Sequence, residues 1–212
     1  MTDLPTPQSR RPLGKSGLTV SALAWGNWRL CGDDVDAVVK LLHAALDAGI
    51  DFIDTADIYG PDNNEPFGAS EQLLGRALAT DPALRDKFVI ATKGGISMGV
   101  PYDSSAAYLT SAIDASLQRL GTDRVELWQI HRPDMLTHPA EIAEAISRAH
   151  QAGKIRSFGV SNFTVSQIAT LQQFLDLPIV STQPELSALK LAPIENGELD
   201  QAMAMDMAVM AW

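Results

Sequence analysis

The chain of 212 residues carries 16 Lys and Arg against 26 Asp and Glu, which gives a formal net charge of −10, and 46% of its residues are hydrophobic. The acidic balance disfavours nucleic acid as a partner, because binding to phosphates requires concentrated Lys and Arg. Cys31 is the only cysteine, so an intrachain disulfide and a zinc site built from cysteines are excluded, and no uninterrupted apolar run reaches the roughly 18 residues that a membrane span needs.

The chain begins with a polar, Pro-containing segment, residues 1–14, that lacks the apolar core of a secretory signal. We therefore expect a cytoplasmic protein with neither nucleic acid nor a membrane as a partner. A hairpin is expected next, over residues 13–20, where Gly14 and Gly17 supply the turn.

From there on, short apolar runs typical of buried strands alternate with amphipathic helical patterns. The strands are expected at residues 22–26, 50–54, 87–93, 124–130, 155–161, 178–183 and 207–212. The helices are expected at residues 34–48, 70–78, 105–120, 139–153, 164–174 and 198–206. In the first of these helices Val35, Val38, Leu42 and Leu46 share one face, and Gly49 ends the helix.

Repeated strand–helix units predict an α/β fold, because parallel strands need crossover helices between them. No GxGxxG motif follows the first strand, and the even spacing of the units favours a closed barrel over an open doubly wound sheet. The composition shows no break along the chain. We therefore expect a single domain over residues 1–212 with the architecture of a (β/α)8 TIM barrel.

The predicted strands end in polar or aromatic residues, although their interiors consist of Val, Ile, Leu and Ala. In a (β/α)8 barrel, functional side chains gather at the C-terminal ends of the strands. The residues at or just after these ends include Trp28, Asp54, Lys93, His131, Ser161, Asn162, Gln183 and Trp212. One mouth of the barrel is thus expected to hold an acid, a lysine, a histidine and several amide and hydroxyl groups.

Tyr59 follows Asp54 by five residues in the loop after the second strand, in the segment DTADIYG. A lysine ammonium beside a tyrosine favours the phenolate, so we expect Lys93 to lower the pKa of Tyr59 from its usual value of about 10. An aspartate paired with the lysine keeps the ammonium charged and oriented. This combination suits a general acid that delivers a proton to a developing alkoxide, with His131 orienting the carbonyl oxygen.

These residues lie in motifs that resemble those of the aldo-keto reductase family. The motifs occur in the family's order and read DFIDTADIYG, ASEQLLGRAL, VIATKGG, LWQIHRPD, GKIRSFGVSNF and TQPELS. The resemblance covers the chain from about Leu13 to Trp212, and the joint occurrence of the motifs makes it specific. It implies reduction of aldehydes or ketones to alcohols, with hydride passing directly from NADPH to a small carbonyl substrate.

Carried over by position, the family's catalytic tetrad falls on Asp54, Tyr59, Lys93 and His131. In the family the tyrosine is the general acid, the lysine and aspartate tune it, and the histidine positions the carbonyl.

The resemblance also assigns residues around the cofactor NADP(H) and the substrate. Ser161, Asn162 and Gln183 match the residues that bind the nicotinamide carboxamide, and Trp212 matches an aromatic residue that stacks on the nicotinamide face. Trp28 falls where the family places residues of the substrate pocket.

Two other functional interpretations remain beside this one. Asp54 and His131 are compatible with a metal-dependent barrel hydrolase, but HxH and HExxH spacings are absent from the sequence and we expect no metal site. A non-catalytic, reductase-like protein that binds nicotinamide or serves as an interaction subunit is the second alternative.

Several further residues have a structural explanation. Trp25 and Trp128 are expected to pack as ordinary core residues. Asp57, Asp62 and Glu65 lie in a loop rich in Gly, Pro and Asn, so we expect these carboxylates to be solvated.

The length departs from the resemblance, since this barrel typically takes about 250 residues. The chain ends at the predicted seventh strand, so we expect a (β/α)8 barrel whose eighth βα unit is missing from this chain, as a C-terminally incomplete portion of a longer reductase. The resemblance places the residues that bind the adenosine 2′-phosphate in that missing portion. The preference for NADP over NAD therefore rests on the resemblance alone.

Overall fold

The computed structural model describes residue 6, residues 8–100 and residues 102–212. Seven strands form one parallel sheet in which each strand pairs with the next along the chain, from β3 to β9. The strands are β3 (Ala24–Gly26), β4 (Phe52–Asp54), β5 (Val89–Gly94), β6 (Val125–Ile130), β7 (Ile155–Ser161), β8 (Ile179–Gln183) and β9 (Ala208–Val209). This sequential order confirms the predicted α/β class and barrel topology, with β3 and β9 as the edges of the sheet in the described part of the chain.

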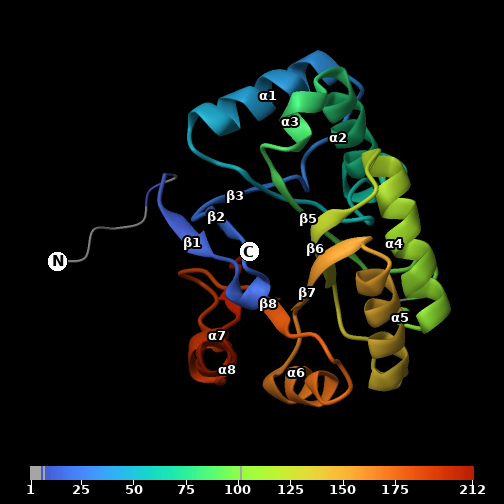
Figure 1. Ribbon diagram of the computed structural model, residues 1–212, viewed down its shortest axis with the longest axis vertical. Helices are drawn as coiled ribbons and strands as arrows, with labels where there is room; N and C mark the ends of the chain where they lie inside the picture. The colour runs from blue at the N-terminus through green and yellow to red at the C-terminus, as the bar shows by residue number, and fades with distance from the viewer. Residues whose placement is uncertain (1–5, 7, 101) are drawn as a thin grey trace.

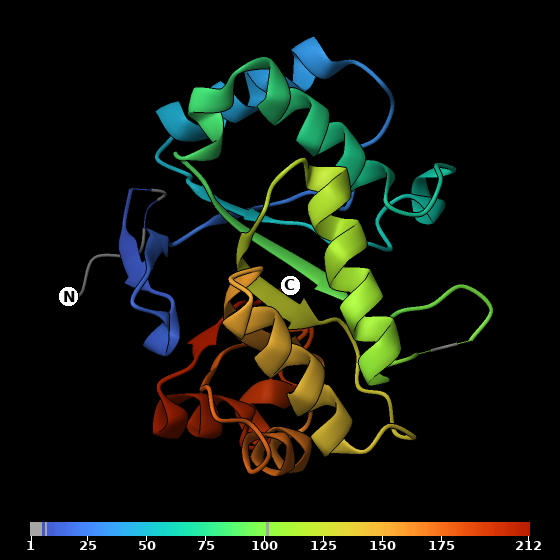
Figure 2. The same ribbon diagram turned by 45° about the vertical axis from the view of Figure 1, so that its right-hand side comes forward.

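The helices form an arc around the strands. In Figure 1, α1, α2 and α3 lie above the sheet, α4 and α5 to its right, and α6, α7 and α8 below it; Figure 2 shows the same arc turned by 45°. Their bounds are α1 (Val35–Asp47), α2 (Ala69–Thr80), α3 (Pro82–Arg85), α4 (Ala106–Leu120), α5 (Pro139–Gln151), α6 (Val165–Gln172), α7 (Ala192–Glu195) and α8 (Glu198–Met205). Within the described residues, none of them is long and apolar enough to cross a membrane.

Side-chain caps determine where several helices begin. Asp34 accepts a hydrogen bond from the Ala37 amide at 2.9 Å before α1, and Ser105 caps α4 in the same way. Thr164 and Gln167 form a reciprocal capping box at the start of α6. These caps satisfy the free amides of the first helical turn close to the strand ends. The loops that carry the site residues are thereby anchored on the helix side.

Two apolar layers lie on opposite faces of the sheet. The outer layer packs strands against helices and includes Trp128, which is fully buried as expected, while the partly buried Trp25 packs against it. The inner layer consists of Leu13, Val20, Phe52, Ala91, Leu127 and Val180. Since side chains alternate along a strand, the residues two positions after Phe52, Ala91 and Leu127 point to the same inner face. A polar layer formed by Asp54, Lys93 and Gln129 therefore lies directly above this apolar layer.

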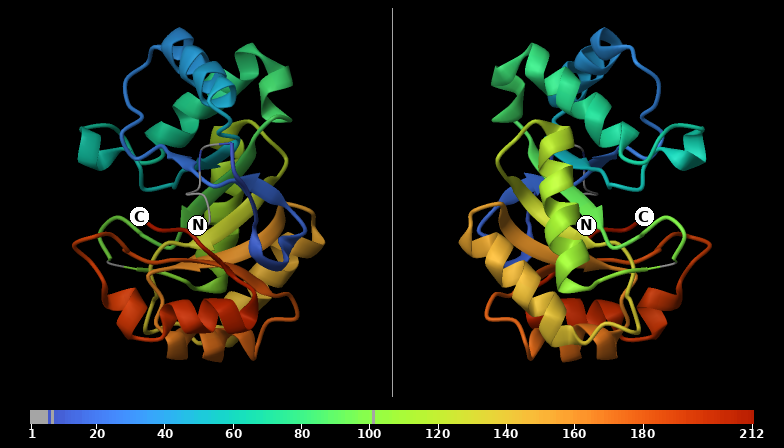
Figure 3. Two further views of the ribbon diagram at one scale, coloured as in Figure 1. Left: turned by 90° about the vertical axis from the view of Figure 1, so that its left-hand side faces the viewer. Right: turned by 90° about the vertical axis from the view of Figure 1, so that its right-hand side faces the viewer.

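The N-terminal hairpin covers the inner apolar layer. Its antiparallel strands are β1 (Arg10–Pro12) and β2 (Thr19–Ser21), so the expected segment 13–20 is mainly the connection, with a 3₁₀ turn at Gly14–Ser16. Gly14 has φ +51°, and a Cβ atom there would lie 2.1 Å from the carbonyl oxygen of Val180. Only glycine permits this approach, which places Leu13 and Val20 in the inner layer. Figure 3 shows the hairpin beside the strands of the sheet.

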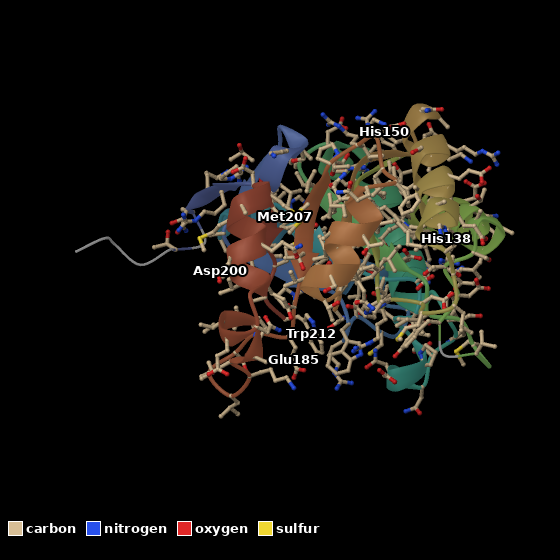
Figure 4. The ribbon with its side chains drawn as sticks, turned by 90° about the horizontal axis from the view of Figure 1, so that it is seen from below. His138, His150, Glu185, Asp200, Met207 and Trp212 are labelled. Atoms are coloured by element: carbon tan, nitrogen blue, oxygen red, sulfur yellow. The ribbon has the colours of Figure 1, made fainter. Side chains whose placement is uncertain are left out.

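The last strand is shorter than the sequence predicted, because β9 covers only Ala208–Val209 of the expected segment 207–212. The chain then leaves the sheet and pairs with the segment after β8. The Trp212 amide donates to the Pro184 carbonyl, and its own carbonyl accepts from the Leu186 amide, each at 3.2 Å. Figure 4 accordingly shows Trp212 beside Glu185.

Candidate active site

A cavity of about 540 Å³ lies at the C-terminal ends of the strands. It is lined by every residue that the sequence predicted for the site, namely Trp28, Asp54, Tyr59, Lys93, His131, Ser161, Asn162, Gln183 and Trp212. The fold thus brings together side chains from seven strands or the loops that follow them, which is the arrangement that a (β/α)8 barrel produces.

Lys93 is the most buried charged group of the cavity, with 1% of its surface exposed. Its Nζ donates to both carboxylate oxygens of Asp54 at 2.8 and 2.7 Å, to the Thr55 carbonyl at 2.9 Å and to the Tyr59 hydroxyl at 3.2 Å. Burial by itself lowers the pKa of Lys93, but the Asp54 carboxylate and the Tyr59 phenol together raise it above its usual value. The ammonium therefore keeps its charge at neutral pH.

Tyr59 receives a hydrogen bond from Lys93, so its own O–H proton is not used in that contact. The expectation of a lowered pKa is wrong. Burial has the largest effect and raises the pKa of Tyr59 above its usual value of 10, Lys93 lowers it, and Asp54 raises it again by offsetting the lysine charge. Tyr59 is consequently a protonated phenol at neutral pH that holds one proton to donate.

His131 stands edge-on to Tyr59, with ring centroids 5.8 Å apart and planes at 82°. Burial and the neighbouring charges of Lys93 and Arg132 hold the pKa of His131 well below its usual value of 6.5, so the ring is neutral at pH 7. Its Nδ1 is buried and has no hydrogen-bond partner in the described part of the chain. A buried N–H without an acceptor is rarer than an unpaired acceptor, which favours the tautomer with the proton on Nε2.

Hydroxyl and amide groups at the ends of β7 and β8 also line the cavity. The Ser161 hydroxyl donates to the Gln183 carbonyl at 2.9 Å, and Asn162 Nδ2 donates to Ser161 Oγ at 2.9 Å and to the His131 carbonyl at 3.1 Å. Trp212 Nε1 donates to Asn162 Oδ1 at 3.2 Å, and 49% of Trp212 is exposed. Amide donors and acceptors beside an exposed indole suit a nicotinamide ring and its carboxamide, so the residues present fit the cofactor that the family implies.

Gln183 is brought to the cavity, but its side-chain amide is already bonded at both ends. Nε2 donates to Asp54 Oδ2 at 3.0 Å, and Oε1 accepts from Gln129 Nε2 at 3.0 Å. The residue expected to contact the nicotinamide thus also contacts the carboxylate that holds Lys93. Sequence analysis did not single out Gln129, although it lies two residues before His131 on β6 and therefore on the same face of the strand.

Trp28 and charged residues form the wall nearest the first two strands. Trp28 is 45% exposed, its Nε1 donates to Asp62 Oδ2 at 3.2 Å, and the Arg29 guanidinium lies 4.0 Å from the centre of its ring. Arg132 lies 5.8 Å from the centre of the Trp212 ring. Sequence analysis missed the two arginines as cavity residues, although each directly follows a residue that it had assigned. Asp62 is exposed, as expected, but it also lines the cavity.

Asp57 contradicts the expectation that it is solvated, because only 1% of it is exposed. It lies beside the fully buried Glu71, which accepts hydrogen bonds from Thr92 and from Arg119 Nε, the latter at 2.7 Å. Burial, and next the charge of Glu71, raise the pKa of Asp57 well above its usual value. Asp57 follows directly on the buried segment 52–56, and its burial depends on the packing of α2, which carries Glu71.

The alternative of a metal-dependent hydrolase finds no support in this geometry. Both Asp54 oxygens accept from the Lys93 ammonium, whose charge repels a metal cation. Among the described residues, no group of three or more His, Cys, Asp or Glu side chains is arranged to hold a metal ion. Figure 4 shows His138 at the start of α5 and His150 on α5, away from Trp212 at the cavity.

Comparison with known proteins agrees with the motifs and with the fold. The sequence model of the Aldo/keto reductase family matches residues 22–212. The chain is 55% identical over 214 residues to the 6-dehydroglucose reductase of Novosphingobium aromaticivorans, an alignment that covers 100% of this chain and 70% of that protein. It is 35% identical to the L-glyceraldehyde 3-phosphate reductase of Escherichia coli K12, over 90% of this chain and 56% of that protein.

The solved structures show the same likeness. The glycerol dehydrogenase of Gluconobacter oxydans superposes with a TM-score of 0.82 at 34% identity, covering 97% of this chain and 63% of that one. A thermostable aldo-keto reductase, Tm1743, superposes with a TM-score of 0.81 at 26% identity and with 72% of its length covered. The present chain therefore spans between 56% and 72% of the lengths of these relatives.

Proposed function

Because the chain belongs to the aldo/keto reductase family, we propose that it reduces aldehydes or ketones to alcohols with NADPH as the hydride donor. The observation that carries this proposal is the contact of the Lys93 ammonium with the Tyr59 hydroxyl inside a cavity that can hold a carbonyl compound. We propose that residues 1–212 belong to a single barrel domain and that this domain carries out the reaction.

The proton is the part of the reaction that this chain supplies. The bound cofactor contributes the hydride. Tyr59 gives its proton to the developing alkoxide oxygen, and the resulting phenolate is stabilised by Lys93, which Asp54 holds in place. His131, neutral with its proton on Nε2, offers a second hydrogen bond to the same carbonyl oxygen. Two donors from neighbouring rings orient the carbonyl and stabilise the charge that forms on it.

The nicotinamide end of the cofactor is assigned to the part of the cavity lined by residues that follow β7, β8 and β9. Ser161 and Asn162 would hold the carboxamide, Gln183 would contribute its remaining amide proton, and Trp212 would cover the ring. This assignment is supported by the residue types, by their shared cavity and by the family, and it leaves Tyr59 and His131 facing the substrate.

A polyhydroxylated aldehyde is the substrate class that the cavity wall fits best. Asp62 and Arg29 supply a charged acceptor and charged donors for hydroxyl groups, and the partly exposed indole of Trp28 offers an apolar surface for a sugar carbon chain. The names of two relatives, reductases of 6-dehydroglucose and of L-glyceraldehyde 3-phosphate, support this class. Glyceraldehyde should then be reduced with a higher kcat/KM than propanal. Asp62→Ala should lower the ratio of these two kcat/KM values.

Replacing Tyr59 by Phe tests the proposed reaction directly. Oxidation of NADPH is followed with 4-nitrobenzaldehyde as substrate, and we expect turnover to fall at least about 100-fold, because general acid catalysis typically contributes that much or more. Tyr108→Phe is the matched control: it removes a hydroxyl that is bonded to the Ile96 carbonyl and does not line the cavity, and it should retain turnover.

Binding separates the proposal from its alternative. NADPH should quench tryptophan fluorescence in the unsubstituted chain and in Tyr59→Phe alike, because Trp212 adjoins the assigned nicotinamide site. Quenching without any turnover would favour a non-catalytic nicotinamide-binding protein. Turnover that is the same in Tyr59→Phe and in the unsubstituted chain would refute the role of Tyr59.

A further inference from the structure

A row of paired residues runs across four neighbouring strands at the level of Lys93. The pairing of strands β5 to β8 puts Lys93 opposite Gln129, Gln129 opposite Gly159, and Gly159 opposite Ser181. Gln129 and Ser181 are both fully buried, and neither lines the cavity. The proposed reaction leaves Gln129 without a role, although an uncharged amide buried beside Lys93 needs partners for two donors and an acceptor.

Gln129 finds a partner for one of these donors and for the acceptor in a continuous series of hydrogen bonds that ends at the site. Ser181 Oγ donates to Gln129 Oε1 at 3.3 Å, Gln129 Nε2 donates to Gln183 Oε1 at 3.0 Å, and Gln183 Nε2 donates to Asp54 Oδ2 at 3.0 Å. Asp54 then accepts from Lys93, which donates to the Tyr59 hydroxyl. The path therefore connects a buried residue of β6 to the proposed proton donor.

The chemistry of Asp54 determines the orientation of both side-chain amides in this series of hydrogen bonds. A carboxylate paired with an ammonium can only accept, so Gln183 must turn its NH₂ group toward Asp54 and its carbonyl oxygen toward Gln129. Gln129 must in turn offer its NH₂ group, which leaves its oxygen for the Ser181 hydroxyl. A flip of either amide would place two acceptors against each other.

Gly159 makes room for this arrangement. A Cβ atom built on Gly159 would lie 2.0 Å from Ser181 Oγ and 3.3 Å from Gln129 Cγ. Any side chain at this position of β7 would displace the Ser181 hydroxyl, which is the first group in the series of hydrogen bonds. The glycine of the segment FGVSN is thus explained by packing inside the sheet, where Gln129 and Ser181 meet across it.

We propose that Gln129 is a positioning residue that holds the Gln183 amide in the orientation in which it donates to Asp54, and so keeps Asp54, Lys93 and Tyr59 aligned for proton transfer. The effect of Gln129 on turnover rests on the proposed function, whereas its effect on Gln183 does not. Gln129 does not line the cavity, so it acts on the site through Gln183 and contacts neither cofactor nor substrate.

Gln129→Met tests this proposal, since methionine has a similar volume but no donor for Gln183. Loss of one such hydrogen bond corresponds to roughly a 2- to 12-fold change, and we expect kcat to fall within that range while KM for NADPH changes less than about twofold. Gln201→Met is the matched control, because Gln201 lies on α8 and donates to the Val165 carbonyl, outside the cavity. It should leave both constants unchanged.

The side-chain amide resonances of Gln183, identified by their loss in Gln183→Glu, give a readout that does not need turnover. They should shift in Gln129→Met and stay in place in Gln201→Met. Unshifted resonances, or shifted resonances with an unchanged kcat, would overturn the proposal. Shifted resonances in a chain that reduces no aldehyde would instead refute the proposed function. If Gln129→Met does not fold, Gln129→Glu, which keeps the shape and turns an acceptor toward Gln183, is expected to give the same shifts.

Discussion

Lys93 and Asp54 form a buried ion pair whose energetic weight can be tested by removing one partner and then both. Their side chains are 2% and 10% exposed, and Lys93 Nζ lies 2.7 Å from Asp54 Oδ2. At an effective permittivity of about 20, opposite charges at this distance attract by about 6 kcal/mol. Lys93→Met keeps most of the side-chain volume but leaves the Asp54 carboxylate buried without its cation.

We expect Lys93→Met to lower the free energy of unfolding by about 3–5 kcal/mol, the usual cost of an uncompensated buried charge. For a chain of this size that corresponds to a fall in Tm of about 6–20 °C. Adding Asp54→Asn removes the stranded charge while it keeps an acceptor for Gln183. The double variant should therefore be more stable than Lys93→Met by about 1 kcal/mol or more, although it departs further from the native sequence.

Urea unfolding followed by tryptophan fluorescence measures these differences. Lys154→Met serves as the control, since Lys154 pairs with Asp114 at the surface and such exposed pairs contribute within about 1 kcal/mol. A loss in Lys93→Met no larger than that in Lys154→Met would refute the reasoning. So would a double variant that is no more stable than Lys93→Met alone.

Three further outcomes follow from the buried groups. Gly159→Ala should cost about 1–3 kcal/mol in urea unfolding, because its Cβ would overlap Ser181 Oγ, and Ser181→Ala in the same chain should restore most of the loss. The pKa of Asp57 lies above its usual 3.8 in the folded chain, so the free energy of unfolding decreases as pH rises through and beyond that value. Asp57→Asn should remove this contribution to the decline in Tm measured between about pH 4 and pH 8. An equal decline in Tm in Asp57→Asn and in the unsubstituted chain would contradict the argument. Because the pKa of His131 is held below 6.5, turnover that needs its neutral ring should stay constant down to pH 6.5 and fall only at lower pH. A decline centred above pH 6.5 in the pH–rate profile would argue against a neutral His131 ring.

Most of the assigned site residues were predictable because they lie at or just after the end of an apolar run. Asp54 follows Phe52 and Ile53, and Lys93 ends a run of buried residues, so their position in the strand was sufficient to place them at the barrel mouth. The even alternation of strands and helices likewise indicated the order of the sheet, because a parallel strand can only be reached through a crossover.

Contacts between strands that are far apart in the sequence were not predictable in the same way. The bond from Gln183 to Asp54 joins residues 129 positions apart, and no local pattern indicates it. Asp57 was misjudged for the same reason, since its burial beside Glu71 depends on how α2 packs, while its sequence neighbours resemble a loop. Gln129 carried a signal only through its two-residue offset from His131.

What the sequence alone determined is the set of reactive groups and the end of the barrel at which they gather, because both depend on periodicity and order along the chain. Only the tertiary structure decided their protonation and orientation. The sequence predicted that Lys93 would lower the pKa of Tyr59, but burial, together with the charge of Asp54, raises it instead. Burial and the distance to a charge depend on residues from several strands, so the state of an ionisable group is fixed only when those strands meet.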